Sequence, residues 1–189
     1  ADVAAFASAA GLALPALQVV GHSWGAMTAA ALPAAGLRPS TLVLLDPPAV
    51  SHATIAAMAV DPDERTYADL AEAVAAVGRD NPDWPDGDIL AKAEALTQLD
   101  EAAARAVVMD NGDWDGGLAD LADPAAAGIP VWVVRGDPAA GGLLLDEALP
   151  AFRARVGEDH ITTIPGAPHS PHRLVPVETT AALLRALEA

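Results

Sequence analysis

The sequence has no cysteine and few basic residues, and each shortage excludes a class of chemistry. Without cysteine, the chain can form no disulfide, use no thiolate nucleophile and hold no cysteine-ligated zinc. Ten basic against 26 acidic residues give a net charge of −16 and a pI near 4.3. No basic patch is therefore expected to neutralise the phosphates of a nucleic acid or to attract an anionic membrane. We expect neither among the partners.

Long hydrophobic runs are also missing, although the sequence is apolar overall. No apolar run approaches the roughly 20 residues that a membrane-spanning helix needs, and nothing at the start of the sequence looks like a secretory signal peptide. A hydrophobic content of 52% and a mean hydropathy of +0.29 argue against general disorder. The sequence therefore predicts a soluble cytoplasmic protein, and 189 residues suffice for one domain with an inserted subdomain.

The segment from Leu17 to Met27 combines an apolar strand, a sharp turn and an alanine-rich helix. The apolar run stops at Gly21 and the helical run begins at Ala26, so Ser23 lies at the tip of the turn. Gly21 and Gly25 are expected to relieve the crowding that so tight a turn creates. The helix N-terminus beside Ser23 favours negative charge. The pattern predicts a nucleophilic serine, and the alternative is an ordinary glycine-rich turn.

Strand and helix patterns alternate in the first and last parts of the chain. Continuous apolar runs predict strands at 17–20, 41–45, 129–134 and 160–164, and an amphipathic pattern predicts a closing helix at 177–187. Strands that are apolar throughout are typical of parallel sheets buried on both faces. The predicted fold class is therefore α/β, with a parallel sheet and helices on both of its faces.

The middle of the chain has a different character. Residues 51–128 show helical periodicity with few strand signals, and they carry 17 of the 26 acidic residues. We expect residues 1–50 and 129–189 to form the core in two parts, and residues 51–128 to form a helical cap or lid between them in sequence.

Four side chains that could serve as a nucleophile, an acid or a base follow the predicted strands: Ser23, Asp46, Asp137 and His169. The carboxyl ends of parallel strands meet at one rim of the sheet. A serine hydroxyl is a weak nucleophile until an imidazole removes its proton, and the imidazole needs a carboxylate to fix its tautomer. The order along the chain predicts a Ser-Asp-His triad at this rim.

Three motifs together resemble the α/β-hydrolase superfamily: Gly21-His22-Ser23-Trp24-Gly25, the turn at Asp137, and Gly166-Ala167-Pro168-His169. The resemblance runs from the nucleophile strand of that family to its last helix, with residues 51–128 in the place of its helical cap. It implies a partial α/β-hydrolase fold, Ser23 as the nucleophile and His169 as the base. It implies no cofactor and no metal.

The sequence also departs from the family pattern. The family has several strands before the nucleophile strand, and a loop after one of them, often His-Gly, supplies an oxyanion N–H. Neither feature occurs in these 189 residues, so the chain is expected to be the C-terminal portion of a longer enzyme or an unusual minimal member. The backbone N–H of Trp24 is the one recognisable oxyanion donor.

Three aspartates are candidates for the acid. Asp137 is preferred, because it follows the penultimate strand, although it comes directly after Gly136 and Ala139 occupies the usual place. Asp46 is the alternative, because some family members place the acid after the preceding strand, and Asp146 is the third candidate. Asp137 and Asp46 each precede a proline and could instead serve as turn formers.

The remaining candidates concern the base and the substrate. His172 is the runner-up to His169 as the base. His22 and Trp24 flank Ser23, and His52 stands at the start of the predicted cap, so all three are candidate substrate contacts. The ring of Trp24 could contact the substrate, or it could simply pack against the protein core.

We expect a serine hydrolase that acts on an ester, amide or related acyl bond of a small uncharged substrate, because an acidic cap should repel anions. Two alternatives remain. One is another reaction on the same triad, such as carbon–carbon bond hydrolysis, peptidase activity or acyl transfer. The other is a non-catalytic binding protein or inactive remnant. Substrate identity and oligomeric state do not follow from the sequence.

Overall fold

The computed structural model of the chain describes residues 2–12, 16–58, 65–110 and 113–189. The chain divides into two compact units. The first, here called the sheet unit, combines Ala1–Val50 with Trp114–Ala189, and the second, here called the helical unit, is Ser51–Asp113. Within the described residues, no helix is both long enough and apolar enough to cross a bilayer.

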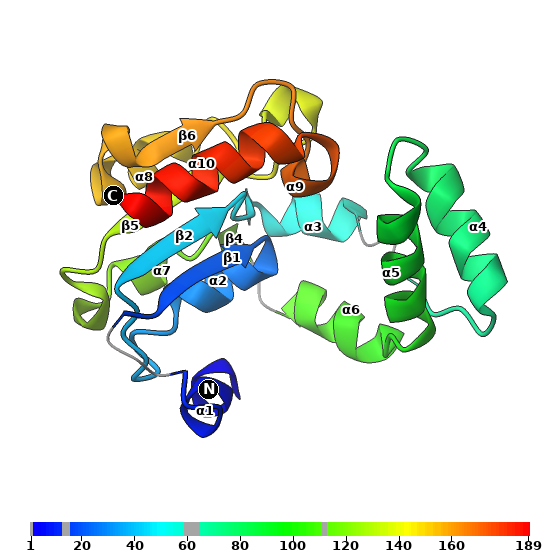
Figure 1. Cartoon of the computed structure of the whole chain (residues 1–189), viewed down its shortest axis with the longest axis horizontal. Helices are drawn as coiled ribbons and strands as arrows, with labels where there is room; N and C mark the ends of the chain where they lie inside the picture. Colours follow the sequence, from blue (N-terminus) through cyan, green and yellow to red (C-terminus); the bar gives the residue numbers. More distant parts are fainter. Residues whose placement is uncertain (1, 13–15, 59–64, 111–112) are drawn as a thin grey trace. The chain divides into compact units, whose positions relative to one another are not determined.

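A parallel sheet forms the centre of the sheet unit (Figure 1). Its four strands lie in the order β1-β2-β5-β6, with bounds β1 Gln18–His22, β2 Thr41–Leu45, β5 Val131–Arg135 and β6 Ile161–Thr163. Val20 pairs with Val43, and Val43 pairs with Trp132. All three strand pairings are parallel, so the four carboxyl ends share one rim of the sheet.

Alternating side chains of the strands build a core on each face of the sheet. Leu42 and Leu44 of β2 pack with α2 (Trp24–Ala30) and α8 (Leu149–Val156) on one face. Val43 and Leu45 pack with α10 (Pro176–Glu188) on the other, and Figure 1 shows α10 and α2 on opposite sides of the sheet. A strand buried on both faces must be apolar at every position. The α/β class and the helices on both faces are therefore as predicted.

The shorter elements of the sheet unit surround this core. They are α1 Asp2–Ala9, β3 Ala49–Val50, β4 Trp114–Asp115, α7 Leu118–Leu121, η1 Pro124–Ala126, η2 Pro138–Ala140, η3 Glu158–His160 and α9 Pro171–Leu174. The strands β3 and β4 pair antiparallel as a separate small ribbon. The helix α2 ends at Ala30.

The helical unit consists of α3 His52–Met58, α4 Leu70–Asp80, α5 Asp86–Thr97 and α6 Glu101–Asp110. Asp69 caps α4 by accepting a hydrogen bond from the N–H of Glu72 at 3.0 Å, as expected where Asp stands three residues before Glu. Buried residues of α4 and α5 form a small apolar core of their own with Tyr67.

The boundary of the helical unit differs from the one expected at residue 128. Trp114 and Asp115 pair with β3, and Leu121 of α7 lies fully buried in the core beneath the sheet. Residues 114–128 therefore belong to the sheet unit. Their short elements carry too little helical or strand periodicity for the sequence to assign them.

Candidate active site

Ser23 sits between β1 and α2 in a strained backbone conformation. Its φ of 57° and ψ of −127° are unusual for a residue other than glycine. The backbone N–H of Ser23 donates to the carbonyl of Leu45 at 3.0 Å, which continues the pairing of β1 with β2 beyond the strand. The pairing holds the strained turn in place, so the serine hydroxyl is presented at the rim of the sheet.

The two glycines that flank Ser23 have different roles. A Cβ atom added to Gly21 would lie 2.1 Å from the carbonyl oxygen of Gly25 and 2.8 Å from the Cα of Ala26. At Gly25, an added Cβ would meet no atom within 4 Å. Gly21 is therefore required by close backbone approach, whereas the expected crowding at Gly25 is absent.

His169 links Ser23 to a carboxylate through the two nitrogens of its ring. Its Nε2 lies 2.8 Å from Ser23 Oγ, and its Nδ1 lies 2.7 Å from Asp46 Oδ2. The side chain of His169 is 27% exposed, and that of Asp46 is fully buried. A serine hydroxyl, an imidazole and a carboxylate thus form one continuous hydrogen-bonded chain at the carboxyl ends of the strands.

Asp46 lies in a site built to hold a buried negative charge. Its φ of 43° turns the chain directly after β2. Besides the His169 ring, its carboxylate accepts hydrogen bonds from the N–H groups of Gly136 at 3.0 Å, Leu143 at 2.9 Å and Leu144 at 3.4 Å. A buried carboxylate without such donors would be very costly. The loop after β5 therefore compensates the charge of Asp46.

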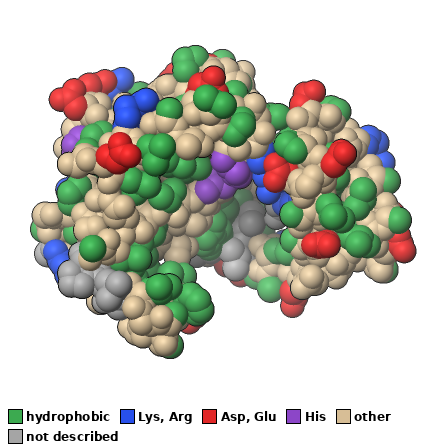
Figure 2. Space-filling view, in the orientation of Figure 1, with side chains coloured by type: hydrophobic (Ala, Val, Ile, Leu, Met, Phe, Trp, Pro, Cys, Tyr) green, Lys and Arg blue, Asp and Glu red, His purple; other side chains and the backbone are tan. Residues whose placement is uncertain are grey.

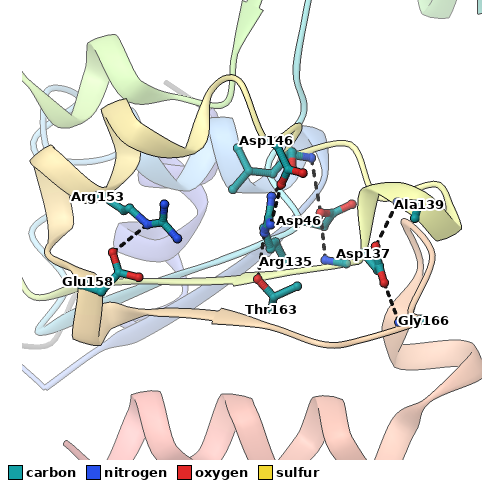
Figure 3. Close-up of polar contacts among 11 residues, drawn as sticks. Asp46, Arg135, Asp137, Ala139, Asp146, Arg153, Glu158, Thr163 and Gly166 are labelled. Atoms are coloured by element: carbon teal, nitrogen blue, oxygen red, sulfur yellow. Dashed lines mark hydrogen bonds and ion pairs between the residues drawn. The ribbon is translucent and has the colours of Figure 1, made fainter.

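The preferred acid of the sequence analysis, Asp137, lies elsewhere, as Figure 3 shows. Its Oδ2 accepts from the N–H of Gly166 at 3.0 Å and its Oδ1 from the N–H of Ala139 at 2.9 Å. These two hydrogen bonds lower the pKa of Asp137, which is a half-buried residue. The structure therefore places the alternative, Asp46, and not Asp137 against His169.

Asp146, the third candidate for the acid, makes a different contact. Its carboxylate lies 2.8 Å from Nη2 of Arg135 and is 76% exposed (Figure 3). The buried guanidinium of Arg135 also donates to Thr163 Oγ1 and to the carbonyl of Leu144. These contacts attach the loop that follows β5 to the strand β6. They place no carboxylate against the His169 ring.

His22 belongs to a group of three histidines. Histidine side chains gather in a patch on the face of the molecule shown in Figure 2. The His22 ring centroid lies 4.8 Å from that of His169 and 4.8 Å from that of His172. Its Nε2 lies 2.7 Å from the backbone oxygen of His169, and burial lowers its pKa to about 4. One of the two ring nitrogens of His22, a candidate substrate contact, is therefore engaged by the chain itself.

His172, the runner-up base, lies on α9 with an exposed side chain that packs edge-on against His22. The structure brings His169, rather than His172, to the serine hydroxyl.

Trp24 is the first residue of α2, so its backbone N–H has no acceptor within that helix. The residue is 37% exposed, and its ring meets the ring of Trp114 edge-on, with centroids 5.1 Å apart. Trp114 was not expected at this site. Trp114 lies on β4, which pairs with β3 a few residues after Asp46. This pairing joins segments that are distant in the sequence, and no local sequence pattern predicts it.

His52 begins α3 in the helical unit. Its backbone N–H donates to Asp113 Oδ1 at 2.5 Å, and its Nδ1 is buried without a hydrogen-bond partner among the described residues. A contact of His52 with substrate stays a prediction. No group of three or more metal-ligating side chains occurs among the residues that the structure describes.

Three solved structures similar to this chain are hydrolases. An E-2-(acetamidomethylene)succinate hydrolase matches with a TM-score of 0.71 and 22% identity over 100% of this chain and 72% of its own. A proline iminopeptidase of Mycobacterium smegmatis matches with a TM-score of 0.63 and 20% identity over 99% of this chain and 69% of its own. An N-formylmaleamic acid deformylase of Pseudomonas putida S16 matches with a TM-score of 0.66 and 20% identity over 96% of this chain and 70% of its own.

At these identities the solved structures show a shared fold, and no curated protein matches the sequence. The family of the chain is shown by its sequence. The model of the alpha/beta hydrolase family matches residues 1–183, nearly the whole chain. The chain therefore belongs to the alpha/beta hydrolase family.

Proposed function

We propose that the chain is a serine hydrolase with Ser23 as the nucleophile, His169 as the general base and Asp46 as the acid. The observation that carries the proposal is the hydrogen-bonded chain from Ser23 Oγ through His169 to Asp46 Oδ2. The buried carboxylate fixes the His169 tautomer with the proton on Nδ1, which leaves Nε2 as the acceptor that faces the serine hydroxyl.

The reaction follows from these positions. Ser23 Oγ attacks the acyl carbonyl carbon while its proton moves to His169 Nε2. The negative oxygen of the tetrahedral intermediate accepts a hydrogen bond from the backbone N–H of Trp24 at the start of α2. Collapse of the intermediate breaks the bond to the leaving group, which takes the proton from Nε2. Water, activated by the same nitrogen, then releases the acyl group from Ser23.

The aromatic pair beside Ser23 supports an apolar acyl group in the substrate. Trp24 immediately follows the nucleophile, and Trp114 packs against its ring. Indole rings supply a large apolar contact area next to the scissile bond. Together with the net charge of −16, this favours small uncharged esters or amides over anionic substrates. A clear preference for an anionic ester over its uncharged analogue of equal length would contradict this assignment.

A fluorophosphonate probe tests the proposed chemistry, because it reacts covalently with an activated serine. We expect the chain to be labelled, Ser23→Ala to abolish labelling and His169→Ala to reduce its rate by about 10³-fold or more. Circular dichroism of each variant checks that it is folded. A folded wild-type chain that is not labelled would instead support a non-catalytic binding protein.

A further inference from the structure

We infer that His22 is a positioning residue that holds the backbone of His169, and so fixes the distance from the His169 ring to Ser23, through a hydrogen bond from its neutral Nε2–H to the His169 carbonyl. This inference rests on the proposed function, because it assigns His22 a part in preparing the same serine. It replaces the expectation that His22 contacts substrate.

The direction of this hydrogen bond follows from its chemistry. A backbone carbonyl only accepts, so the ring nitrogen 2.7 Å away must carry the proton. The ring is therefore the Nε2–H tautomer. Because burial lowers its pKa to about 4, the ring stays neutral around pH 6. The groups that act on it are His169, His172 and Asp46.

The position of His22 in the chain makes this contact effective. His22 ends β1, and Ser23 is the next residue. The end of one strand thus meets His169 twice, at its backbone oxygen through His22 and at its ring nitrogen through Ser23. A displacement of the His169 backbone relative to β1 therefore disturbs both contacts.

The segment that carries His169 depends on such tethers. Residues 164–170 contain no helix or strand and connect β6 to α9. Asp137 holds the first part of this loop, donating its own N–H to the carbonyl of Ala167 at 2.7 Å and accepting from Gly166. His22 holds the part nearest to the catalytic ring. A shift of about 1 Å at a reacting group can cost about 100-fold in rate.

Paired substitutions at His22 provide the kinetic test. Leucine removes the donor, whereas glutamine places a neutral amide N–H close to the position of Nε2. With p-nitrophenyl acetate, we expect His22→Leu to lower kcat by about 10-fold to 100-fold with KM changed less than about 3-fold, and His22→Gln to lose less than about 5-fold. The rate of fluorophosphonate labelling should fall in the same order.

A second histidine supplies the matched control. His160 also places a ring nitrogen, Nδ1, 3.1 Å from a backbone carbonyl, that of Val131, and stacks on Trp132 away from Ser23. We expect His160→Leu to leave kcat within about 2-fold of the wild type. Equal losses in His22→Leu and His22→Gln, or a wild-type rate in a folded His22→Leu, would overturn the inference.

Nitrogen-15 NMR of the full chain with labelled histidine gives a readout that requires no activity. At pH 6 the inference requires a neutral His22 ring protonated at Nε2. A ring protonated at Nδ1 alone, or a charged ring at this pH, overturns it even if the variants fail to fold. If the tautomer is as inferred but Ser23 is not labelled by the probe, the proposed function fails and the contact of His22 with His169 stands.

Discussion

At the scale of single residues, two aspartates that look alike in the sequence have different environments. Asp46 and Asp137 each follow a strand and precede a proline. Asp46 is fully buried and contacts the His169 ring, whereas Asp137 is half-buried and accepts hydrogen bonds from two backbone N–H groups. The two environments differ because the backbone N–H groups of the loop 136–144 donate to the carboxylate of Asp46. Asp46 lies 90 residues before that loop begins.

The two aspartates therefore respond differently to replacement by asparagine. We expect Asp46→Asn to lower kcat for p-nitrophenyl acetate by about 10²–10⁴-fold, because the amide no longer fixes the His169 tautomer or stabilises its charge. Asp137→Asn should lower kcat by less than about 5-fold, since it perturbs only hydrogen bonds that hold the backbone of the loop. A larger loss in Asp137→Asn than in Asp46→Asn would restore Asp137 as the acid.

The two glycines around Ser23 give a second contrast. Gly21→Ala should destabilise the chain by about 3 kcal/mol or more, because its methyl group would overlap the backbone of Gly25. Gly25→Ala should be neutral or stabilise it by about 0.4–1 kcal/mol, since the position is helical and open. Urea unfolding of both variants measures the difference. Equal destabilisation would show that the close approach at Gly21 is not limiting.

His22 makes stability depend on pH. Its pKa is about 4 in the folded chain and near 6.5 when unfolded, so the unfolded chain binds the proton first as the pH falls. We expect stability to decline as the pH falls from 6.5 towards 4 and this contribution to level off below 4. Urea unfolding at pH 7 and pH 5 measures the decline, which should be smaller in His22→Gln than in the wild type.

At the scale of elements, the sequence predicted most of the sheet. The strand at Thr41–Leu45 has its expected bounds, and the closing helix differs from its expected range by one residue at each end. These elements have a strong local signal, because burial on both faces requires continuous apolar runs and an amphipathic helix repeats every 3.6 residues. The turn at Ser23 follows equally from local sterics at Gly21.

Other elements had no comparable signal. The ribbon of Ala49–Val50 with Trp114–Asp115 consists of two-residue strands that pair across 63 intervening residues. The donors to Asp46 come from a loop in which Gly142 packs against Gly136, with an added Cβ 2.8 Å from the Gly136 carbonyl carbon. One clue was available, since Asp46 stands among residues apolar enough to be buried, and a buried carboxylate requires partners.

At the scale of the whole molecule, charge is the dominant property. The net charge of −16 comes largely from residues 51–128, which carry 17 of the 26 acidic residues, and Figure 2 shows acidic side chains at several places on the face in view. Repulsion among like charges opposes the compact state and is screened by salt. The excess of acid should therefore lower stability at low ionic strength.

Calorimetry at different salt concentrations tests this expectation. We expect Tm at pH 7.5 to rise by several degrees between about 10 mM and 500 mM NaCl, because the Debye length falls from about 30 Å to below 10 Å. An equal osmolality of sucrose serves as the control for effects of excluded solute. A Tm that falls with salt would indicate that favourable ion pairs outweigh the repulsion.

The location of the proposed acid, Asp46, directly after the second strand also bears on how such a chain can change in evolution. Ser23 and Asp46 lie within one stretch of 24 residues, entirely before the helical unit, and His169 comes from the segment after it. Replacement of Ser51–Asp113 by another insertion would leave the covalent spacing of nucleophile and acid untouched. The insertion could then change freely, while the residues of the proposed triad are inherited in two intact pieces.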